Sequence, residues 1–198
     1  MPASRLPEVV LVRHGETEWS RSGQHTGRTD LELTAHGREE AEEAARKLGG
    51  RPFVAVLSSP LRRARETARI AGHPDPELTD DLREWDYGDY EGLTTAQIRA
   101  DRPGWTLWRD GCPGGEDAAA VGARVDRVIE RLRGLKGDAA VFAHGHVLRV
   151  FGARWAGLPP QRGSILALST ATVSVLGYER ETPVLWSWND GRPVDGSA

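Results

Sequence analysis

The stretch that decides the fold is VVLVRHG, residues 9–15. Its first four residues are aliphatic and three of them are β-branched, which predicts a buried strand over residues 9–12. The charged residue Arg13 and the polar residue His14 follow directly after this apolar run. A second stretch, AAVFAHGH at residues 139–146, repeats the plan of a short apolar run that ends in a His-Gly pair. The two stretches therefore predict two buried strands with a histidine at the end of each.

Helical patterns alternate with the strand patterns along the chain. Thr34 is placed to cap a helix over residues 35–48, which Gly49 and Gly50 would end. Pro60 is placed at the start of a second predicted helix, over residues 61–71. The remaining predicted helices cover residues 95–102, 117–135 and 147–156. The other predicted strands cover residues 53–58, 139–143, 165–168, 173–178 and 184–188. Strands that alternate with helices predict an α/β fold, a three-layer α/β/α sandwich with a mostly parallel central sheet. Ligands bind beyond the carboxyl ends of such strands, so the two His-bearing ends are expected to meet at one edge.

Bulk composition limits the classes of function. The 198 residues carry a net charge of −3, which gives no general attraction to nucleic acid or to an anionic membrane. The single cysteine, Cys112, allows no intrachain disulfide, no apolar stretch approaches the roughly 18 residues of a membrane span, and the N-terminus lacks an apolar signal core. We therefore expect one cytoplasmic domain over residues 1–198, with a core at about 8–190, a loose tail at 191–198, and neither a membrane nor nucleic acid as partner.

His14 is a candidate nucleophile. A histidine considered alone is usually structural, but this one lies between an arginine and a glycine at the end of a buried strand. Arginine offers a rigid, charged fork for phosphate oxygens, and glycine lets a phosphate approach the backbone. A neutral imidazole has a free nitrogen lone pair near pH 7 and can attack phosphorus, provided that an acceptor such as a backbone carbonyl fixes the other ring nitrogen.

His144 repeats the pattern on a second strand. Gly145 opens the helix that follows, and the first N–H groups and the positive dipole end of a helix favour anions. A protonated His144 would add one more donor to a phosphate. The alternatives are a core histidine bonded to the backbone, or a metal ligand paired with His146. No third ligand of suitable spacing accompanies that pair and Arg13 would repel a cation, so we expect no metal.

Further groups for phosphate chemistry follow the second strand of the chain. Arg62 and Arg63 lie near the start of a helix, so one of them is expected to turn inward to an anion. A proton donor for the leaving oxygen is expected in residues 84–91, where carboxyl groups stand among aromatic side chains and burial favours the protonated form. Spacing alone does not choose among Glu84, Asp86, Asp89 and Glu91.

Five motifs together resemble the histidine phosphatase superfamily, also called phosphoglycerate mutase-like. They are LVRHGETEW at 11–19, GQHTGRTD at 23–30 with LTAHG at 33–37, SSPLRRARET at 58–67, LREWDYGDYEG at 82–92 and FAHGHVLR at 142–149. They follow one another in the order found in the superfamily. Within it, the chain looks most like sedoheptulose-1,7-bisphosphatase-like members and related bacterial acid phosphatases, on the basis of Trp19 with Ser20 and of residues 24–27, 84–92 and 108–112.

The resemblance implies a role for each motif. His14 would be the phosphohistidine nucleophile, and Glu84 would be the proton donor and then the proton acceptor. The groups that would hold the transferring phosphoryl group are Arg13, Arg63 and His144. The implied substrate contacts are His25, Thr26, Tyr87, Gly145 and Arg149.

The function implied by this resemblance is that of a phosphomonoesterase with no metal and no cofactor. It would act, as a monomer or homodimer, on small phosphorylated metabolites such as sugar phosphates or bisphosphates. The alternative is a phosphoglycerate mutase-type phosphotransferase, but those members carry a basic inserted segment after the acid/base loop. In this chain, the only basic residues of the corresponding segment, residues 93–112, are Arg99, Arg102 and Arg109, and the segment has no lysine. A phospho-ligand binding module without catalysis is a third alternative, which the complete set of catalytic residue types disfavours.

Overall fold

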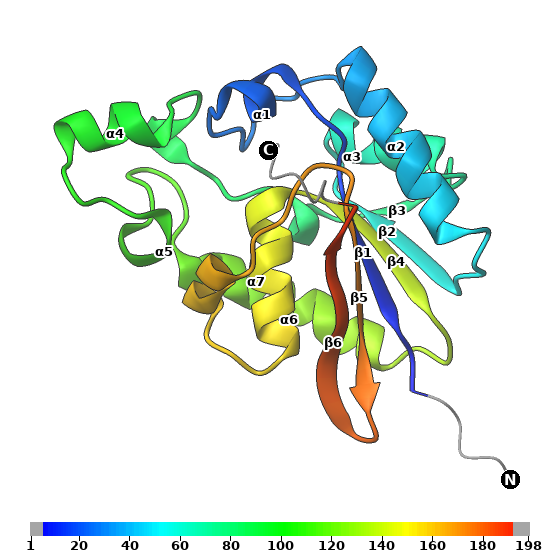
Figure 1. Cartoon of the computed structure of the whole chain (residues 1–198). Coiled ribbons are helices and arrows are strands. Elements are labelled where there is room, and N and C mark those ends of the chain that lie inside the picture. Colours follow the sequence, from blue (N-terminus) through cyan, green and yellow to red (C-terminus); the bar gives the residue numbers. More distant parts are fainter. Residues whose placement is uncertain (1–5, 192–198) are drawn as a thin grey trace, which may run out of the picture.

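A six-stranded mixed sheet forms the centre of the computed structural model, which describes residues 6–191 (Figure 1). The strands are β1 (Val9–Arg13), β2 (Ala55–Ser58), β3 (Glu77–Leu78), β4 (Ala139–Ala143), β5 (Val173–Glu179) and β6 (Thr182–Asp190), in the spatial order β3-β2-β4-β1-β5-β6. The pairings β3–β2, β2–β4 and β4–β1 are parallel, whereas β1–β5 and β5–β6 are antiparallel. The expected α/β class is confirmed, and the predicted tail lies, apart from Gly191, outside the described residues.

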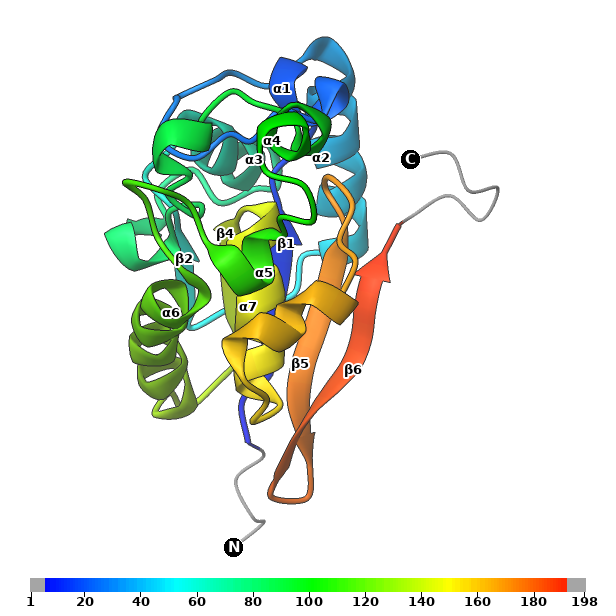
Figure 2. The ribbon, with the colours of Figure 1, turned by 90° about the vertical axis from the view of Figure 1, so that its left-hand side faces the viewer.

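Helices cover both faces of this sheet (Figures 1 and 2). The α-helices are α1 (Glu18–Ser22), α2 (Ala35–Leu48), α3 (Arg62–Ile70), α4 (Thr95–Asp101), α5 (Leu107–Asp110), α6 (Ala118–Arg133) and α7 (Gly145–Trp155). Because side chains alternate along a strand, Val9 and Leu11 of β1 pack with α6 and α7. Val10 and Val12 pack on the opposite face with α2 and with residues of α3. The two core clusters therefore give the three layers that the alternating pattern predicted.

Local sequence signals set most element boundaries close to where they were expected. Thr34 caps α2, since its hydroxyl accepts from Gly37 N at 2.9 Å, and Gly49 ends that helix in the left-handed conformation with a φ of 60°. β2 begins at Ala55, two residues later than predicted, and α3 begins at Arg62, one residue later. The first turn of α3 consequently lies next to the carboxyl end of β2.

The strand predicted at residues 165–168 is wrong. Ile165 ends a 3₁₀ helix, η3 (Pro160–Ile165), and the residues after it form no strand. Side chains rather than a neighbouring strand use the carbonyl groups there, because Trp188 Nε1 donates to Ala167 O at 2.6 Å and Arg13 Nη1 donates to Leu168 O. Elements that were not predicted are α1, α5, β3 and two 3₁₀ turns, η1 (Asp80–Leu82) and η2 (Gly88–Tyr90).

Candidate active site

The carboxyl ends of β1 and β4 meet at one edge of the sheet. Arg13 and Ala143 stand opposite each other in the parallel register, and His14 N donates to the Ala143 carbonyl at 3.0 Å. This pairing places the rings of His14 and His144 with their centroids 5.1 Å apart. The two distant motifs therefore converge, as the order of elements predicted.

The His14 ring is buried and is oriented by the next residue. Its Nδ1 lies 2.7 Å from the Gly15 carbonyl oxygen, which can only accept, so Nδ1 carries the proton and Nε2 carries the lone pair. Gly15 is fixed in turn, because its N–H donates to the Thr67 hydroxyl at 3.1 Å. Burial, and then the charges of Arg63 and Arg13, lower the pKa of His14 well below 6.5. The ring is thus neutral, with Nε2 available as a nucleophile.

Arg13 brings a partly buried guanidinium beside that ring. Its Nη1 donates to the Leu168 carbonyl, which fixes the guanidinium plane, while its Nε is buried with no partner among the described residues. Gly145 lies against this group, since a Cβ there would come within 3.4 Å of both Nε and Cζ. Burial lowers the pKa of Arg13. A partly buried cation with an unused, buried donor is the arrangement that an anion would complete.

Arg63 is the arginine of α3 that turns inward. Its side chain is fully buried. Its Nη1 and Nη2 atoms donate to the backbone carbonyls of Thr29 at 2.9 Å, Thr26 at 3.0 Å and Gly27 at 3.3 Å. Arg62 instead lies at the surface and pairs with Glu32 at 2.6 Å. Of the two arginines left open by the sequence, the structure therefore places Arg63 next to the histidines.

His144 occupies the N-cap position of α7 and is fully buried. Arg63 Nε donates to its Nδ1 at 3.0 Å, and its Nε2 lies 2.7 Å from the Ser59 hydroxyl. Burial and the charge of Arg63 lower the pKa of His144 well below 6.5. The ring is therefore neutral, which differs from the protonated donor that we expected, because an arginine faces the nitrogen that would have to take up the proton.

Glu84 lies at the N-terminal end of α7. Its Oε1 accepts from the N–H groups of Trp85 and Val147, each at 2.9 Å, and its Oε2 accepts from His146 N at 3.0 Å. The other candidate carboxyl groups are engaged elsewhere or exposed: Asp86 pairs with Arg28, Glu91 accepts from Gly27 N and Thr29 N, and Asp89 is exposed. Of the four, Glu84 is the one that is buried and lines the pocket around His14.

A pocket of about 200 Å³ lies over His14. Eight of the ten predicted site residues line it, namely Arg13, His14, His25, Thr26, Glu84, Tyr87, Gly145 and Arg149. Arg63 and His144 do not line it and lie behind its wall. Further lining residues are Thr17, Ser20, Gly23, Gln24, His146 and Leu168. Most of these belong to the quoted motifs and could have been found from them, whereas Leu168 comes from the segment that was wrongly predicted as a strand.

Aromatic rings form one wall of this pocket. His25 stacks on Tyr87, with ring centroids 4.7 Å apart. Burial and the charge of Glu84 raise the pKa of Tyr87 well above 10, so its hydroxyl keeps its proton, and this hydroxyl forms a hydrogen bond of 2.6 Å with His146 Nδ1. The Nε2 of His25 is buried and has no partner within the described part of the chain. The wall therefore offers an unused imidazole nitrogen near His14.

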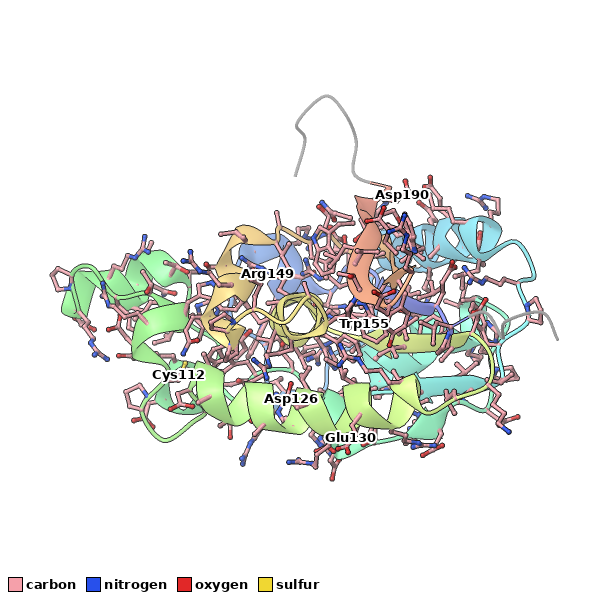
Figure 3. The ribbon with its side chains drawn as sticks, turned by 90° about the horizontal axis from the view of Figure 1, so that it is seen from below. Cys112, Asp126, Glu130, Arg149, Trp155 and Asp190 are labelled. Atoms are coloured by element: carbon pink, nitrogen blue, oxygen red, sulfur yellow. The ribbon has the colours of Figure 1, made fainter. Side chains whose placement is uncertain are left out.

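Arg149 closes the pocket from α7, which Figure 3 shows end-on with this residue labelled. Its guanidinium lies 4.6 Å from the ring centroid of Trp108, and it donates to the carbonyls of Gly163 at 3.1 Å and Ser164 at 3.0 Å. Burial, and then the charge of Arg13, lower the pKa of Arg149. A second cation thus stands close to Arg13, at the rim rather than the floor of the pocket.

A larger cavity of about 600 Å³ adjoins this pocket and shares Arg13, Ser20 and Leu168 with it. Its other charged lining residues are of both signs: Glu16, Arg21, Glu40, Glu43 and Lys47. Within residues 6–191, no group of three or more His, Cys, Asp or Glu side chains is arranged to bind a metal ion. None of the helices in that range combines the length and apolarity that crossing a membrane requires.

Both the sequence and the fold match known proteins. The family model described as histidine phosphatase superfamily (branch 1) matches residues 9–191. The chain belongs to this superfamily. An acid phosphatase of Mycobacterium tuberculosis is 42% identical to this histidine phosphatase, over 96% of this chain and 97% of that protein. A sedoheptulose 1,7-bisphosphatase of Saccharomyces cerevisiae is 39% identical, over 80% of this chain and 71% of that protein.

The structure of an open reading frame product from Mycobacterium tuberculosis superposes on this histidine phosphatase with a TM-score of 0.88. The two chains are 42% identical, and the match covers 92% of this chain and 97% of the other. The family resemblance drawn from the five motifs is therefore confirmed, together with the fold class. The roles of the individual residues stay predictions.

Proposed function

We propose that this histidine phosphatase is a phosphomonoesterase that forms a phosphohistidine on His14 Nε2 and then transfers the phosphate to water. The observation that carries the proposal is the state of His14. Its ring is buried and neutral, and its Nδ1 is tied to the Gly15 carbonyl, so Nε2 is free beside Arg13 and in the same pocket as Glu84. Membership of the superfamily supports the same chemistry.

In the first step, the lone pair of His14 Nε2 forms a bond to phosphorus while the bond from phosphorus to the leaving oxygen breaks. Glu84, in its protonated form, gives its proton to that oxygen, so the product leaves as an alcohol. In the second step, water attacks the phosphorus and gives a proton to Glu84, and the bond to Nε2 breaks. Both the histidine and the protonated glutamic acid are thereby restored.

The charge of the transferring group would be met by groups of the chain itself. Arg13 contributes a guanidinium whose Nε has no partner among the described residues, and the N-terminal end of α7 at Gly145 lies next to it. Arg63 adds a second positive charge from behind the pocket wall, close enough that, in addition to burial, it lowers the pKa of His14. By analogy with other donors to a transition-state oxyanion, removing one of them should cost roughly 10²–10³ in rate. Because guanidinium groups supply the positive charge, we expect turnover to persist in excess EDTA.

We infer that the substrates are small phosphorylated metabolites, with sugar phosphates or bisphosphates as the first class to test. A pocket of about 200 Å³ beside a larger cavity suits a compact leaving group better than a macromolecule. One relative at 39% identity is a sedoheptulose 1,7-bisphosphatase. The proposed contacts to the leaving group are His25, Thr26, Tyr87, Gly145 and Arg149.

A phosphatase is preferred over a mutase because of where three arginines lie. Arg99 donates to the Trp105 carbonyl, and Arg102 and Arg109 pair with Asp110. None of the three lines the pocket over His14. A mutase, by contrast, must retain the dephosphorylated intermediate long enough to return the phosphate to it. We further propose that the chain acts as one cytoplasmic domain, as a monomer or homodimer.

The proposal is tested by phosphate release and by trapping of the intermediate. We expect His14→Ala to abolish both the release of phosphate from a monoester panel and the alkali-stable labelling of the protein by labelled substrate. The matched control is His73→Ala, because this histidine follows α3 and lines neither the pocket over His14 nor the larger cavity, and it should keep both. Turnover by His14→Ala would refute the covalent route. Isomerisation of 3-phosphoglycerate without phosphate release would favour the mutase.

A further inference from the structure

A buried arginine of α6 binds the backbone that carries Glu84. Arg124 is only 8% exposed, although it lies on a long surface helix whose length Figure 3 shows. Its Nη1 donates to the carbonyls of Asp81 at 2.8 Å and Arg83 at 2.6 Å, and its Nη2 donates to the carbonyl of Glu84 at 3.2 Å. One side chain thus holds three backbone carbonyls within residues 81–84.

Glu116 directly precedes Asp117, the N-cap of α6, and it binds both Arg124 and the Glu84 loop. Its carboxylate accepts from Arg124 Nε at 2.8 Å and from Arg124 Nη2 at 3.0 Å. The same carboxylate accepts from Asp86 N at 2.9 Å, and the backbone N–H of Glu116 donates to Asp86 O at 2.9 Å. The Glu116 carbonyl accepts from Trp85 Nε1, also at 2.9 Å. The pair therefore fixes the residues on both sides of the Glu84 side chain.

The backbones of the two segments also approach each other very closely. A Cβ on Gly115 would lie 2.2 Å from Asp86 O and 2.7 Å from Gly88 N, distances that no side chain tolerates. Asp89 N donates to the Pro113 carbonyl at 2.9 Å in the same region. The segment before α6 and the Glu84 loop are consequently docked as one unit, with Arg124 and Glu116 at its centre.

From these contacts we propose that Arg124 and Glu116 are positioning residues that aim the Glu84 carboxyl group at the leaving oxygen. The proposal rests on the acid role of Glu84 in the proposed function. The side chain of Glu84 is held by N–H groups of α7, whereas its backbone carbonyl is held by Arg124 of α6. The position of the carboxyl group therefore depends on both helices. Neither residue lines the pocket over His14.

The chemistry of the pair explains why these residue types are needed. An arginine has five N–H donors in a rigid fork, which lets one side chain reach three carbonyls and a carboxylate together. A lysine of similar length has a single ammonium group and cannot reproduce that spread. A buried charge pair is costly unless its geometry is good and its remaining hydrogen bonds are made. Here those remaining bonds all go to the loop that carries the proton donor.

A comparison of two esters separates positioning of the acid from general damage to the fold. An alkyl phosphate needs a proton on its leaving oxygen, whereas p-nitrophenyl phosphate releases an anion that is stable at neutral pH. The quantity to measure is kcat/KM, which reports the first phosphoryl transfer. A displacement of the acid by about 1 Å costs on the order of 10²-fold. We expect Arg124→Met to lose about that factor for the alkyl ester, and far less for p-nitrophenyl phosphate.

Three further variants complete the experiment. Glu84→Gln should show the same selective loss for the alkyl ester. Glu116→Gln keeps the shape of its side chain and should show a smaller selective loss, and it replaces Arg124→Met if that variant does not fold. Arg154→Met is the matched control, since Arg154 makes a bidentate pair with Asp126 of α6 at 2.8 and 2.9 Å but contacts no part of the Glu84 loop. It should leave both rates unchanged.

The outcomes distinguish the two proposals. If Glu84→Gln is selective but Arg124→Met loses both esters equally, or neither, the positioning role is refuted. If Glu84→Gln is not selective, the acid is another group and the positioning role fails with it. If the unmodified protein releases phosphate from no ester at all, the proposed function itself is wrong.

Discussion

Acid should destabilise this protein through the buried ring of His14. Burial and two arginines lower the pKa of this ring in the folded chain well below the 6.5 of an ordinary histidine. Below pH 6.5 the unfolded chain therefore binds a proton that the folded chain does not, so stability is lost as the pH falls. The loss is about 1.4 kcal/mol for each pH unit until the folded pKa is reached. At pH 5.0, which is 1.5 units lower, it amounts to at most about 2 kcal/mol.

The variant His14→Gln removes this one titrating group and keeps a side chain that can donate to the Gly15 carbonyl. Unfolding free energies of both proteins are measured by denaturant titration at pH 7.5 and at pH 5.0. The contributions of the carboxylates and of the similarly buried His146 are common to both proteins and cancel in the difference. Besides burial and the charge of Arg63, the charge of His14 also lowers the pKa of His144, so the difference includes the part that comes from this pair of rings. We expect the variant to gain up to about 2 kcal/mol on the unmodified protein from pH 7.5 to pH 5.0, or up to about 4–8 °C in Tm. The same difference at both pH values would show that the folded ring titrates normally.

Two further substitutions test the geometry of the site. Gly15→Ala would put a Cβ 2.1 Å from the Gly37 carbonyl oxygen, so α2 or the His14 loop must move, and we expect a loss of about 1–3 kcal/mol in stability and of most activity. Gly134→Ala, where a Cβ meets nothing closer than 3.4 Å, is its control in thermal unfolding. Arg149→Met should lower kcat/KM by about 10- to 100-fold, chiefly through a higher KM, because it removes a proposed charged contact to the substrate rather than a reacting group.

The fold was predictable where one local pattern decides one element. β1 and β4 are short apolar runs with polar residues directly after them, and the Thr34 cap with Gly49 defines α2 to the residue. Residues 165–168 resemble a strand equally well by composition. They form none because the carbonyl of Leu168 binds the side chain of Arg13, a contact between residues 155 positions apart that no local pattern contains.

The same division applies to the candidate site. His14, Arg13 and Glu84 stand in motifs, and the family resemblance assigned them to one site. Spacing alone left Glu84 among four carboxyl groups, and the structure shows that it is the one that lines the pocket over His14. The partner of His144 was not predictable, because the contact with Arg63 Nε depends on how α3 packs against β4. The burial of Arg124 was not predictable either, because a charged residue on an amphipathic helix normally indicates a solvent-exposed face. Its burial follows from the docking of a loop, which is a tertiary feature.

The low basicity of His14 connects the two halves of the proposed reaction. Burial and the charges of Arg63 and Arg13 disfavour any positive charge on this ring, which is why it is neutral and able to attack. Once Nε2 carries a phosphoryl group while Nδ1 keeps its proton, the ring is cationic and meets the same unfavourable environment. The arginines stabilise the negative charge of the phosphoryl group, but they oppose the positive charge of the ring, and a ring of low basicity is a better leaving group. The bond from nitrogen to phosphorus therefore breaks more readily when water attacks. An environment that made His14 more basic would favour a longer-lived phosphohistidine, which a mutase needs and a phosphatase does not.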